Sequence, residues 1–319
     1  MVPLKLTPAF KDYIWGGNKL VRAFGMESPY ERTAEAWVLS CHPDGENVIQ
    51  NGAFAGRTLS DVLAAEGKAW RGTHGNAFSF FPVLIKLIDA KDNLSVQVHP
   101  SDAYALKNEK QYGKTEAWYI LDCDDDAEII YGVNRDLTKA QFRAAIESNT
   151  LLDCVNRVKV KKGDLFFIAS GTLHAICKGI LLAEVQQNSN VTYRVYDYGR
   201  LQDGKPRELH IEKALDVTNL QKIDCSGNPL GAPVQTDGNT ETLLTKCDLF
   251  TVKRLDVTVQ ATVTVDETSF VSLVAIDGNG VLTHGDTVLT LYKGESIFLP
   301  AGLGGVEILG NVSVLVTTV

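Results

Sequence analysis

Two stretches of the sequence repeat one pattern: Gly163-Asp-Leu-Phe-Phe-Ile-Ala-Ser-Gly-Thr-Leu-His174 and Gly294-Glu-Ser-Ile-Phe-Leu-Pro-Ala-Gly-Leu-Gly-Gly305. Each has a glycine, an acidic residue, a short apolar run, a small residue or proline, and a second glycine at the same offsets. A strand between two turn glycines is typical of jelly-roll (double-stranded β-helix) barrels. Because the pattern occurs twice, it predicts two related barrels. Chance recurrence of a short motif in a β-rich chain is the alternative.

The rest of the sequence predicts mostly β structure with some α. Strands are expected at residues 81–90, 94–99, 116–121, 128–131, 164–169, 181–187 and 191–196, and in Val/Thr-rich runs such as 257–265 and 312–319. Helices are expected at residues 59–70, 101–110, 137–152 and 209–217, all in the first barrel's part of the chain. A Gly-, Pro- and Asn-rich stretch at 224–239 is the best linker candidate. We therefore expect a first domain at residues 1–230 and a second at residues 231–319.

Composition restricts the class of protein. The 319 residues include 31 basic and 39 acidic side chains, a net charge of −8, which disfavours a nucleic-acid binder that must neutralise phosphates. No apolar run approaches the ~18 residues of a membrane span, and no signal peptide is visible. The six cysteines show no CxxC pair and are expected to be reduced thiols. We expect a cytoplasmic protein, a monomer or homodimer.

The segment Leu94-Ser-Val-Gln-Val-His-Pro100 places polar side chains on one face of an apolar strand. Alternate residues of a strand share a face, so Ser95, Gln97 and His99 point the same way. Burying such groups without partners costs about 1–3 kcal/mol each. A metal ion would satisfy Gln97 and His99 together; a solvent-facing polar edge is the alternative.

A second polar segment, Gly113-Lys-Thr-Glu-Ala-Trp-Tyr119, puts Lys114, Glu116 and Trp118 on one strand face. The acid and the ammonium form either a surface ion pair of little value or, beside a metal, a ligand and a candidate acid. His174, at the end of the first repeat, adds a second imidazole.

Four side chains then offer two nitrogens, two oxygens and one negative charge: Gln97, His99, Glu116 and His174. A mixed nitrogen and oxygen set suits Zn²⁺, with Mn²⁺, Fe²⁺ or Co²⁺ also admissible. Such a site remains open to substrate oxygens and polarises a carbonyl or hydroxyl. We expect one zinc ion per chain.

A predicted hairpin between residues 181 and 200 carries further charged side chains. If its faces line the mouth of the barrel, Glu184 is a candidate base and Arg194 a candidate donor to a developing enolate oxygen. Arg200 would suit an anionic group, because a guanidinium matches phosphate geometry. An ordinary hairpin with a surface charge network is the alternative.

An ordered series of motifs identifies the family that the chain resembles. The series consists of Tyr13-Ile-Trp-Gly-Gly17, Glu35-Ala-Trp37, Pro82-Val-Leu-Ile-Lys-Leu87, Leu94-Ser-Val-Gln-Val-His-Pro100, Lys114-Thr-Glu116, Gly171-Thr-Leu-His174 and Thr192-Tyr-Arg-Val-Tyr-Asp197. It resembles the type I phosphomannose isomerases, a cupin family, in their short bacterial form. The resemblance runs over about residues 1–220; residues 240–319 resemble only a degenerate second cupin barrel without a metal.

The resemblance implies a role for each candidate residue. The zinc ligands would be Gln97, His99, Glu116 and His174. Arg194 would be the catalytic arginine, with Lys86, Lys114 and Glu184 lining the pocket. Ser95 and Arg200 fall where the family contacts the substrate phosphate. Arg200 departs mildly from the family, which often has lysine at that position.

The expected function is a reversible isomerase that interconverts mannose 6-phosphate and fructose 6-phosphate through a cis-enediol. The proton carrier is left open between Glu184, Lys114, Lys86, His99 and a zinc-bound water, with Glu184 favoured. Two other classes stay open: a metal cupin oxygenase or decarboxylase, and a sugar-binding cupin without turnover. Metal cupin oxygenases and decarboxylases favour histidine-rich ligand sets, whereas the candidate set here includes Gln97 and Glu116. A missing ligand would indicate a cupin without turnover, and all four candidate ligands are present here.

Overall fold

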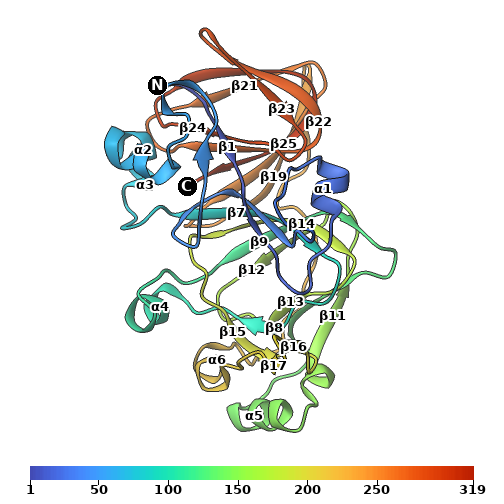
Figure 1. Cartoon of the computed structure of the whole chain (residues 1–319). Helices are drawn as coiled ribbons and strands as arrows, with labels where there is room; N and C mark the ends of the chain where they lie inside the picture. Colours follow the sequence, from blue (N-terminus) through green and yellow to red (C-terminus); the bar gives the residue numbers. More distant parts are fainter.

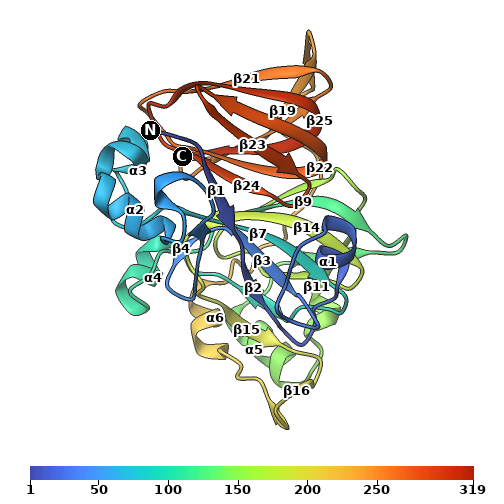
Figure 2. The same ribbon diagram turned by 45° about the horizontal axis from the view of Figure 1, so that its top comes forward.

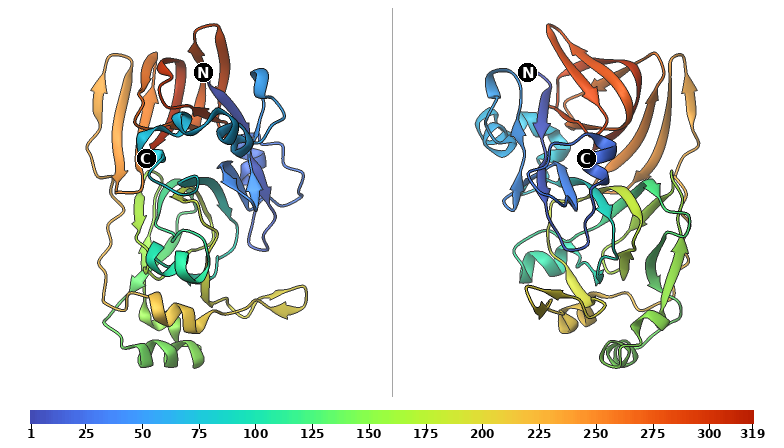
Figure 3. Two further views of the ribbon diagram at one scale, coloured as in Figure 1. Left: turned by 90° about the vertical axis from the view of Figure 1, so that its left-hand side faces the viewer. Right: turned by 45° about the vertical axis from the view of Figure 1, so that its right-hand side comes forward.

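The computed structural model describes residues 1–319 and is mostly β with short helices (Figure 1). Helices lie at α1 Lys19–Phe24, α2 Leu59–Glu66, α3 Gly72–Gly75, α4 Asp102–Asn108, α5 Lys139–Glu147 and α6 Ile211–Val217, with 3-10 turns at Gly52–Phe54, Lys68–Arg71 and Leu151–Cys154. No helix has both the length and the apolar character needed to cross a membrane. The helices lie beside the sheets, and strands build the centre of the molecule (Figure 3).

A ten-stranded sheet contains the C-terminal strands in the order β18-β19-β20-β25-β22-β24-β1-β6, with β21 on β25 and β23 on β22. Its strands are β18 Val234–Thr236, β19 Asn239–Lys246, β20 Thr251–Val257, β21 Gln260–Val265, β22 Val271–His284, β23 Thr287–Tyr292, β24 Ser296–Leu299, β25 Gly304–Thr318, β1 Leu4–Thr7 and β6 Val48–Ile49. The first strand of the chain thus pairs with β24, as Figure 2 shows.

Two further sheets face each other below the ten-stranded sheet (Figure 1). The six-stranded sheet has the order β12 Leu165–Ile168, β9 Glu116–Cys123, β14 Ile180–Gln187, β7 Val83–Ala90, β3 Glu35–Leu39 and β2 Ala9–Lys11. The five-stranded sheet has the order β11 Val155–Lys159, β10 Glu128–Val133, β13 His174–Ile176, β8 Val96–Val98 and β15 Tyr193–Tyr196. Two small hairpins complete the strands: β4 Cys41–His42 with β5 Gly45–Glu46, and β16 Leu201–Gln202 with β17 Lys205–Pro206.

Strand alternation separates the two faces of the six-stranded sheet. On β9, Ala117, Tyr119 and Leu121 pack into the core shared with the ten-stranded sheet. Trp118 and Ile120 point the other way, into the core shared with the five-stranded sheet. Polar residues on that second face are therefore directed into the space between the six- and five-stranded sheets.

Both copies of the sequence repeat adopt the same local structure. In each copy a strand begins two residues after the first glycine: β12 in the first and β24 in the second. The glycines that open the two copies, Gly163 and Gly294, have φ of +92° and +91°. Side chains with a Cβ rarely adopt this conformation, so both turns require glycine.

The strands and helices expected from the sequence are found, with shifted ends. The predicted helix at 59–70 is interrupted by Gly67, and the Thr58 side chain caps its start by accepting a hydrogen bond from the Asp61 N–H. The expected strand at 257–265 is divided between β20 and β21 by a turn. The sequence did not predict α1 or the β1–β6 region, because their short runs carry little periodicity.

Candidate active site

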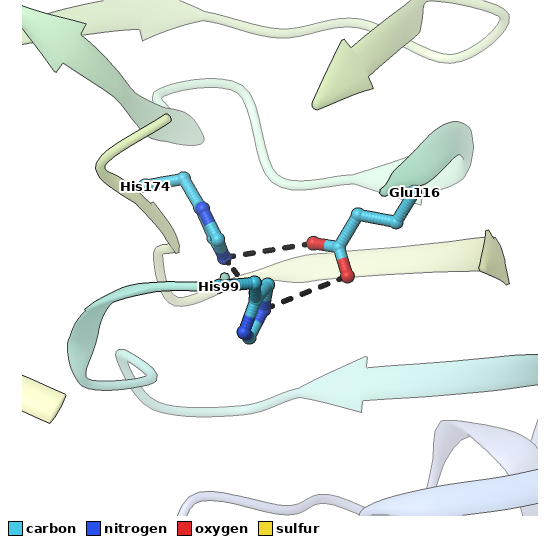
Figure 4. Close-up of side chains that lie close together, drawn as sticks. All are labelled: His99, Glu116 and His174. Atoms are coloured by element: carbon cyan, nitrogen blue, oxygen red, sulfur yellow. Dashed lines mark hydrogen bonds and ion pairs between the residues drawn. The ribbon is translucent and has the colours of Figure 1, made fainter. Parts of the chain in front are cut away.

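The candidate metal ligands come from neighbouring strands of the two facing sheets. Gln97 of β8 lies directly opposite His174 of β13 in register, and His99 follows the end of β8. Glu116 opens β9 in the other sheet. His99, Glu116 and His174 are at most 1% exposed, and their donor atoms lie within 4.8 Å of one another (Figure 4).

Both imidazoles turn an unprotonated nitrogen toward the centre of this cluster. His99 Nδ1 donates to the Val191 carbonyl at 2.9 Å, and His174 Nδ1 donates to the Thr172 carbonyl at 2.8 Å. Each Nε2 is therefore the unprotonated nitrogen of a neutral ring, and the two Nε2 atoms lie 3.1 Å apart. Burial lowers the pKa of His174 to about 4 and holds the pKa of His99 well below its usual range. Neutral imidazole is the form that binds metals.

The carboxylate of Glu116 completes a set that fits a divalent cation. Its Oε1 is buried without a hydrogen-bond partner and lies 3.5 Å from His174 Nε2. Burial, with the nearby Glu184 carboxylate, raises the pKa of Glu116 to about 7. A cation among the three groups would satisfy the unpaired oxygen and both nitrogen lone pairs. The side-chain amide of Gln97 lies 3.5 Å from His174 Nε2, so its oxygen can face the same point after an amide rotation.

Two buried lysines flank the cluster. Lys114 Nζ lies 2.6 Å from Glu116 Oε2 and donates to His99 Nε2 at 3.1 Å. Lys86 Nζ donates to Glu184 Oε1 at 3.0 Å and lies 3.8 Å from Glu35. Although burial alone would lower the pKa of Lys86, the carboxylates of Glu184 and Glu35 outweigh it and raise that pKa.

Glu184 lies between the two ammonium groups. Burial alone would raise the pKa of Glu184, but Lys114 and Lys86 outweigh it and lower the pKa to about 2. Its second oxygen accepts from Trp118 Nε1 at 3.0 Å. The carboxylate is therefore charged at neutral pH, and its affinity for a proton is low.

A cavity of about 300 Å³ opens beside the cluster of His99, Glu116 and His174. It is lined by Tyr13, Trp15, Glu35, Lys86, Ile88, Leu94, Ser95, Gln97, Lys114, Ile176, Glu184, Asn190, Thr192, Arg194 and Arg207. Every candidate site residue lines the cavity except the three buried ligand residues next to it and Arg200. The Arg200 guanidinium instead binds Asp197 at 2.5 Å.

Comparisons with known proteins show the family to which the chain belongs. The profile of the phosphomannose isomerase type I catalytic domain matches residues 3–145, and that of the mannose-6-phosphate isomerase cupin domain matches residues 239–319. Mannose-6-phosphate isomerase ManA of Bacillus subtilis is 40% identical over 99% of this chain and 98% of that protein. The chain belongs to the type I phosphomannose isomerase family.

Further proteins are similar to this chain in sequence or in fold. The mannose-6-phosphate isomerase of Streptococcus mutans is 39% identical over 98% of this chain and 97% of that protein. The crystal structure of the mannose 6-phosphate isomerase from Bacillus subtilis superposes with a TM-score of 0.92 at 39% identity and covers all of both chains. The apo enzyme from Salmonella typhimurium, at 19% identity over 99% of both chains and a TM-score of 0.76, shares the fold.

Several cavity residues of this phosphomannose isomerase family member were not predicted as site residues. Glu35 lies in the Glu35-Ala-Trp37 motif, and alternation along a strand places Glu35 and Trp37 on the same face. That pattern could have marked Glu35 as a site residue, since Trp37 Nε1 donates to Glu35 Oε2 at 2.6 Å. Arg207 had no such signal, because it follows a short hairpin outside every motif. Its place on the cavity wall depends on tertiary contacts alone.

Proposed function

We propose that this chain is a zinc-dependent mannose-6-phosphate isomerase that interconverts mannose 6-phosphate and fructose 6-phosphate. The observation that carries the proposal is the buried cluster of His99, Glu116 and His174 beside a cavity lined by cations. Membership of the family supplies the substrate and reaction class. We propose Gln97 as the fourth ligand and Zn²⁺ as the resident ion, because zinc accepts a mixed nitrogen and oxygen set.

When bound, the ion supplies a Lewis acid that stabilises negative charge on the sugar oxygens O1 and O2. The reaction moves a proton between C1 and C2 through a cis-enediol, so it needs a proton carrier at the carbon and positive charge near both oxygens. Lys114 and Arg194 both line the cavity and are suited to these two tasks.

The proton carrier that the contacts favour is Lys114 rather than Glu184. Glu184 is committed to its ion pairs with the two lysines, and its lowered pKa makes it a weak base. Lys114 reaches the cavity, where its Nζ can exchange a proton with a bound substrate, and its contacts with Glu116 and Glu184 hold it in place. We propose that Glu184 orients Lys86 and Lys114 and that Lys114 acts at the substrate.

Arg194 is proposed as the donor to the developing oxygen charge. It lies opposite Gln97 in the β15–β8 register, and its Nε is buried without a partner. Its Nη1 donates to the Glu208 carbonyl at 2.9 Å, which leaves the rest of the guanidinium for the substrate. An enediolate oxygen would satisfy the unpaired N–H only once charge develops.

We also propose the finer architecture. The six- and five-stranded sheets would form the first jelly-roll barrel, with the metal between them, and the C-terminal strands would form a second, metal-free cupin barrel. The pairing of β25 with β20, β21 and β22 supports a sheet that folds back on itself. The corresponding domains are residues 1–230 and 231–319, with β1 and β6 crossing to the second. We propose a cytoplasmic location, in keeping with six unpaired cysteines.

The direct test is to couple the formation of fructose 6-phosphate from mannose 6-phosphate to a chromogenic reaction. We expect turnover by the purified protein and its loss in Glu116→Gln, which keeps the shape of the ligand and removes its charge. Arg157→Gln, a surface variant on β11, serves as the control and should retain activity. A wild-type protein with intact folding and zinc but no turnover would refute the proposed function and leave a sugar-binding cupin.

A further inference from the structure

One end of the cavity carries a surplus of positive charge. Asp197 is shared by two arginines: Arg207 Nε donates to its Oδ2 at 2.8 Å, and Arg200 Nη2 donates to its Oδ1 at 2.5 Å. Arg194, on the same side, forms no ion pair. Three guanidinium groups therefore face one carboxylate, which leaves a formal charge of +2.

The other end of the cavity has no such surplus. Lys86 is paired with Glu184 and Glu35, and Lys114 is paired with Glu116 and Glu184. Each ammonium thus has two carboxylates within ion-pair distance. A dianionic group entering the cavity is drawn to the arginine end.

Only one of the two arginines on Asp197 is free to meet a ligand. The Arg200 guanidinium donates to Asp197 through Nε and Nη2 and to the Asn93 carbonyl through Nη1, and it does not line the cavity. Arg207 uses Nε and Nη2 on Asp197, while its Nη1 makes no hydrogen bond, and it lines the cavity together with Ser95.

Backbone contacts fix Arg207 beside the proposed catalytic arginine. The His210 N–H donates to the Arg194 carbonyl at 2.7 Å, and the Arg194 N–H donates to His210 Nδ1 at 3.2 Å. With the bond from the Arg194 side chain to the Glu208 carbonyl, these contacts hold residues 207–210 along β15. The Arg207 side chain is 13% exposed, so its position is set by the fold.

We propose that Arg207 binds the phosphate of the substrate and that Arg200 positions it through their shared Asp197. This rests on the proposed isomerase function and reassigns the role that the family resemblance gave to Arg200. Asp197 holds the Nε–Nη2 edge of the Arg207 guanidinium, which leaves its Nη1 end to donate to phosphate oxygens. The Ser95 hydroxyl, on the same lining, adds a donor.

The test compares Arg207→Gln, Arg207→Lys and Arg200→Gln in the zinc-loaded protein. Inorganic phosphate binding is measured by calorimetry, and KM for mannose 6-phosphate by the coupled assay. Because R207Q loses a charged hydrogen bond to phosphate, we expect it to weaken phosphate binding and to raise KM, each by about 10-fold or more. R207K keeps the charge but not the fork and should weaken phosphate binding less than R207Q. R200Q removes only the contact that positions Arg207 through Asp197, so it should weaken phosphate binding and raise KM measurably, but by less than R207Q does.

Each outcome separates the alternatives. Phosphate binding in R207Q equal to that of the wild type overturns the proposal, and a larger loss in R200Q than in R207Q returns the role to Arg200. If R207Q shows no cooperative thermal unfolding and is therefore not folded, R207K is used in its place. A phosphate affinity of R207K equal to that of the wild type then overturns the proposal. Calorimetry does not require turnover, so a wild-type protein that binds phosphate without isomerising mannose 6-phosphate refutes only the proposed function.

Discussion

His99 and His174 are placed by hydrogen bonds that the strand pattern does not contain. The sequence located His99 and Glu116 by alternation along strands and His174 by its place at the end of the first repeat, and the structure brings the three side chains together. It could not show that each Nδ1 is held by a carbonyl, or that Lys114 joins the cluster through two contacts. Such contacts depend on which loops pass the strand ends, and alternation carries no information about them.

The charge on Glu184 likewise emerges only in three dimensions. From the sequence alone, Glu184 is a strand carboxylate that could act as a general base, and the sequence analysis favours it as the proton carrier. The two lysines that lower its pKa lie 98 and 70 positions earlier in the chain: Lys86 is the β7 residue that pairs with Glu184, and Lys114 precedes β9. Tertiary placement of charges, rather than residue type, therefore decides which group can move a proton.

Arg194→Ala tests the residue-scale mechanism. If Arg194 acts on charge that develops in the transition state, kcat should fall by about 100- to 1,000-fold while KM changes little. Steady-state kinetics of the coupled assay measure both constants. R207Q provides the contrast, because its main effect should be on KM. An unchanged kcat in R194A would remove this arginine from the mechanism.

Acid stability of the chelator-treated protein tests the state of His174. Its pKa is about 4 when folded and about 6.5 when unfolded, so the unfolded chain takes up the proton first as the pH falls. The stabilising contribution is complete above pH 6.5 and is lost toward pH 4, which amounts to roughly 3 kcal/mol. Urea unfolding from pH 7 to 4 should show a shallower loss in His174→Asn than in the wild type. Equal slopes would contradict a buried, neutral imidazole.

At the scale of the element, the glycine-bounded repeat was the strongest predictor of structure. Its glycines marked the turns and its apolar run marked β12 and β24 at the same offset. Gly171, the second glycine of the first copy, also has a contact that the repeat does not reveal. Its N–H donates to the His99 carbonyl at 2.8 Å, and an added Cβ would lie 2.9 Å from the Val217 carbonyl oxygen.

The matched pair Gly171→Ala and Gly163→Ala tests this difference. Both positions have positive φ, but nothing lies within 4 Å of a Cβ added at Gly163. G163A should cost about 1–2 kcal/mol of unfolding free energy from backbone strain and leave zinc affinity unchanged. G171A should cost about 3 kcal/mol or more and weaken zinc binding by about 10-fold, because it displaces the turn that holds His99 and His174. Urea unfolding and competition with a chelating dye measure both; equal zinc affinities would contradict the link.

At the scale of the whole molecule, long-range pairing was the part that sequence reasoning could not supply. β1 crosses from the start of the chain to β24 and β6, and Arg254 of β20 donates to the Tyr119 hydroxyl of β9 at 2.8 Å. The ten-stranded sheet is thereby attached to the outer face of the sheet whose inner face carries Glu116. The sequence of a strand as short as β1 does not specify the strand with which it pairs.

The metal-binding cluster is the claim on which the proposed function depends. The most direct measurement strips the protein with a chelator, then titrates Zn²⁺ while recording bound metal and the rate of fructose 6-phosphate formation. Activity should be absent in the stripped protein and rise in proportion to bound zinc, reaching its maximum at about one ion per chain, with E116Q failing to recover. Full turnover by the stripped protein, or zinc binding that is unaffected by E116Q, would contradict the account.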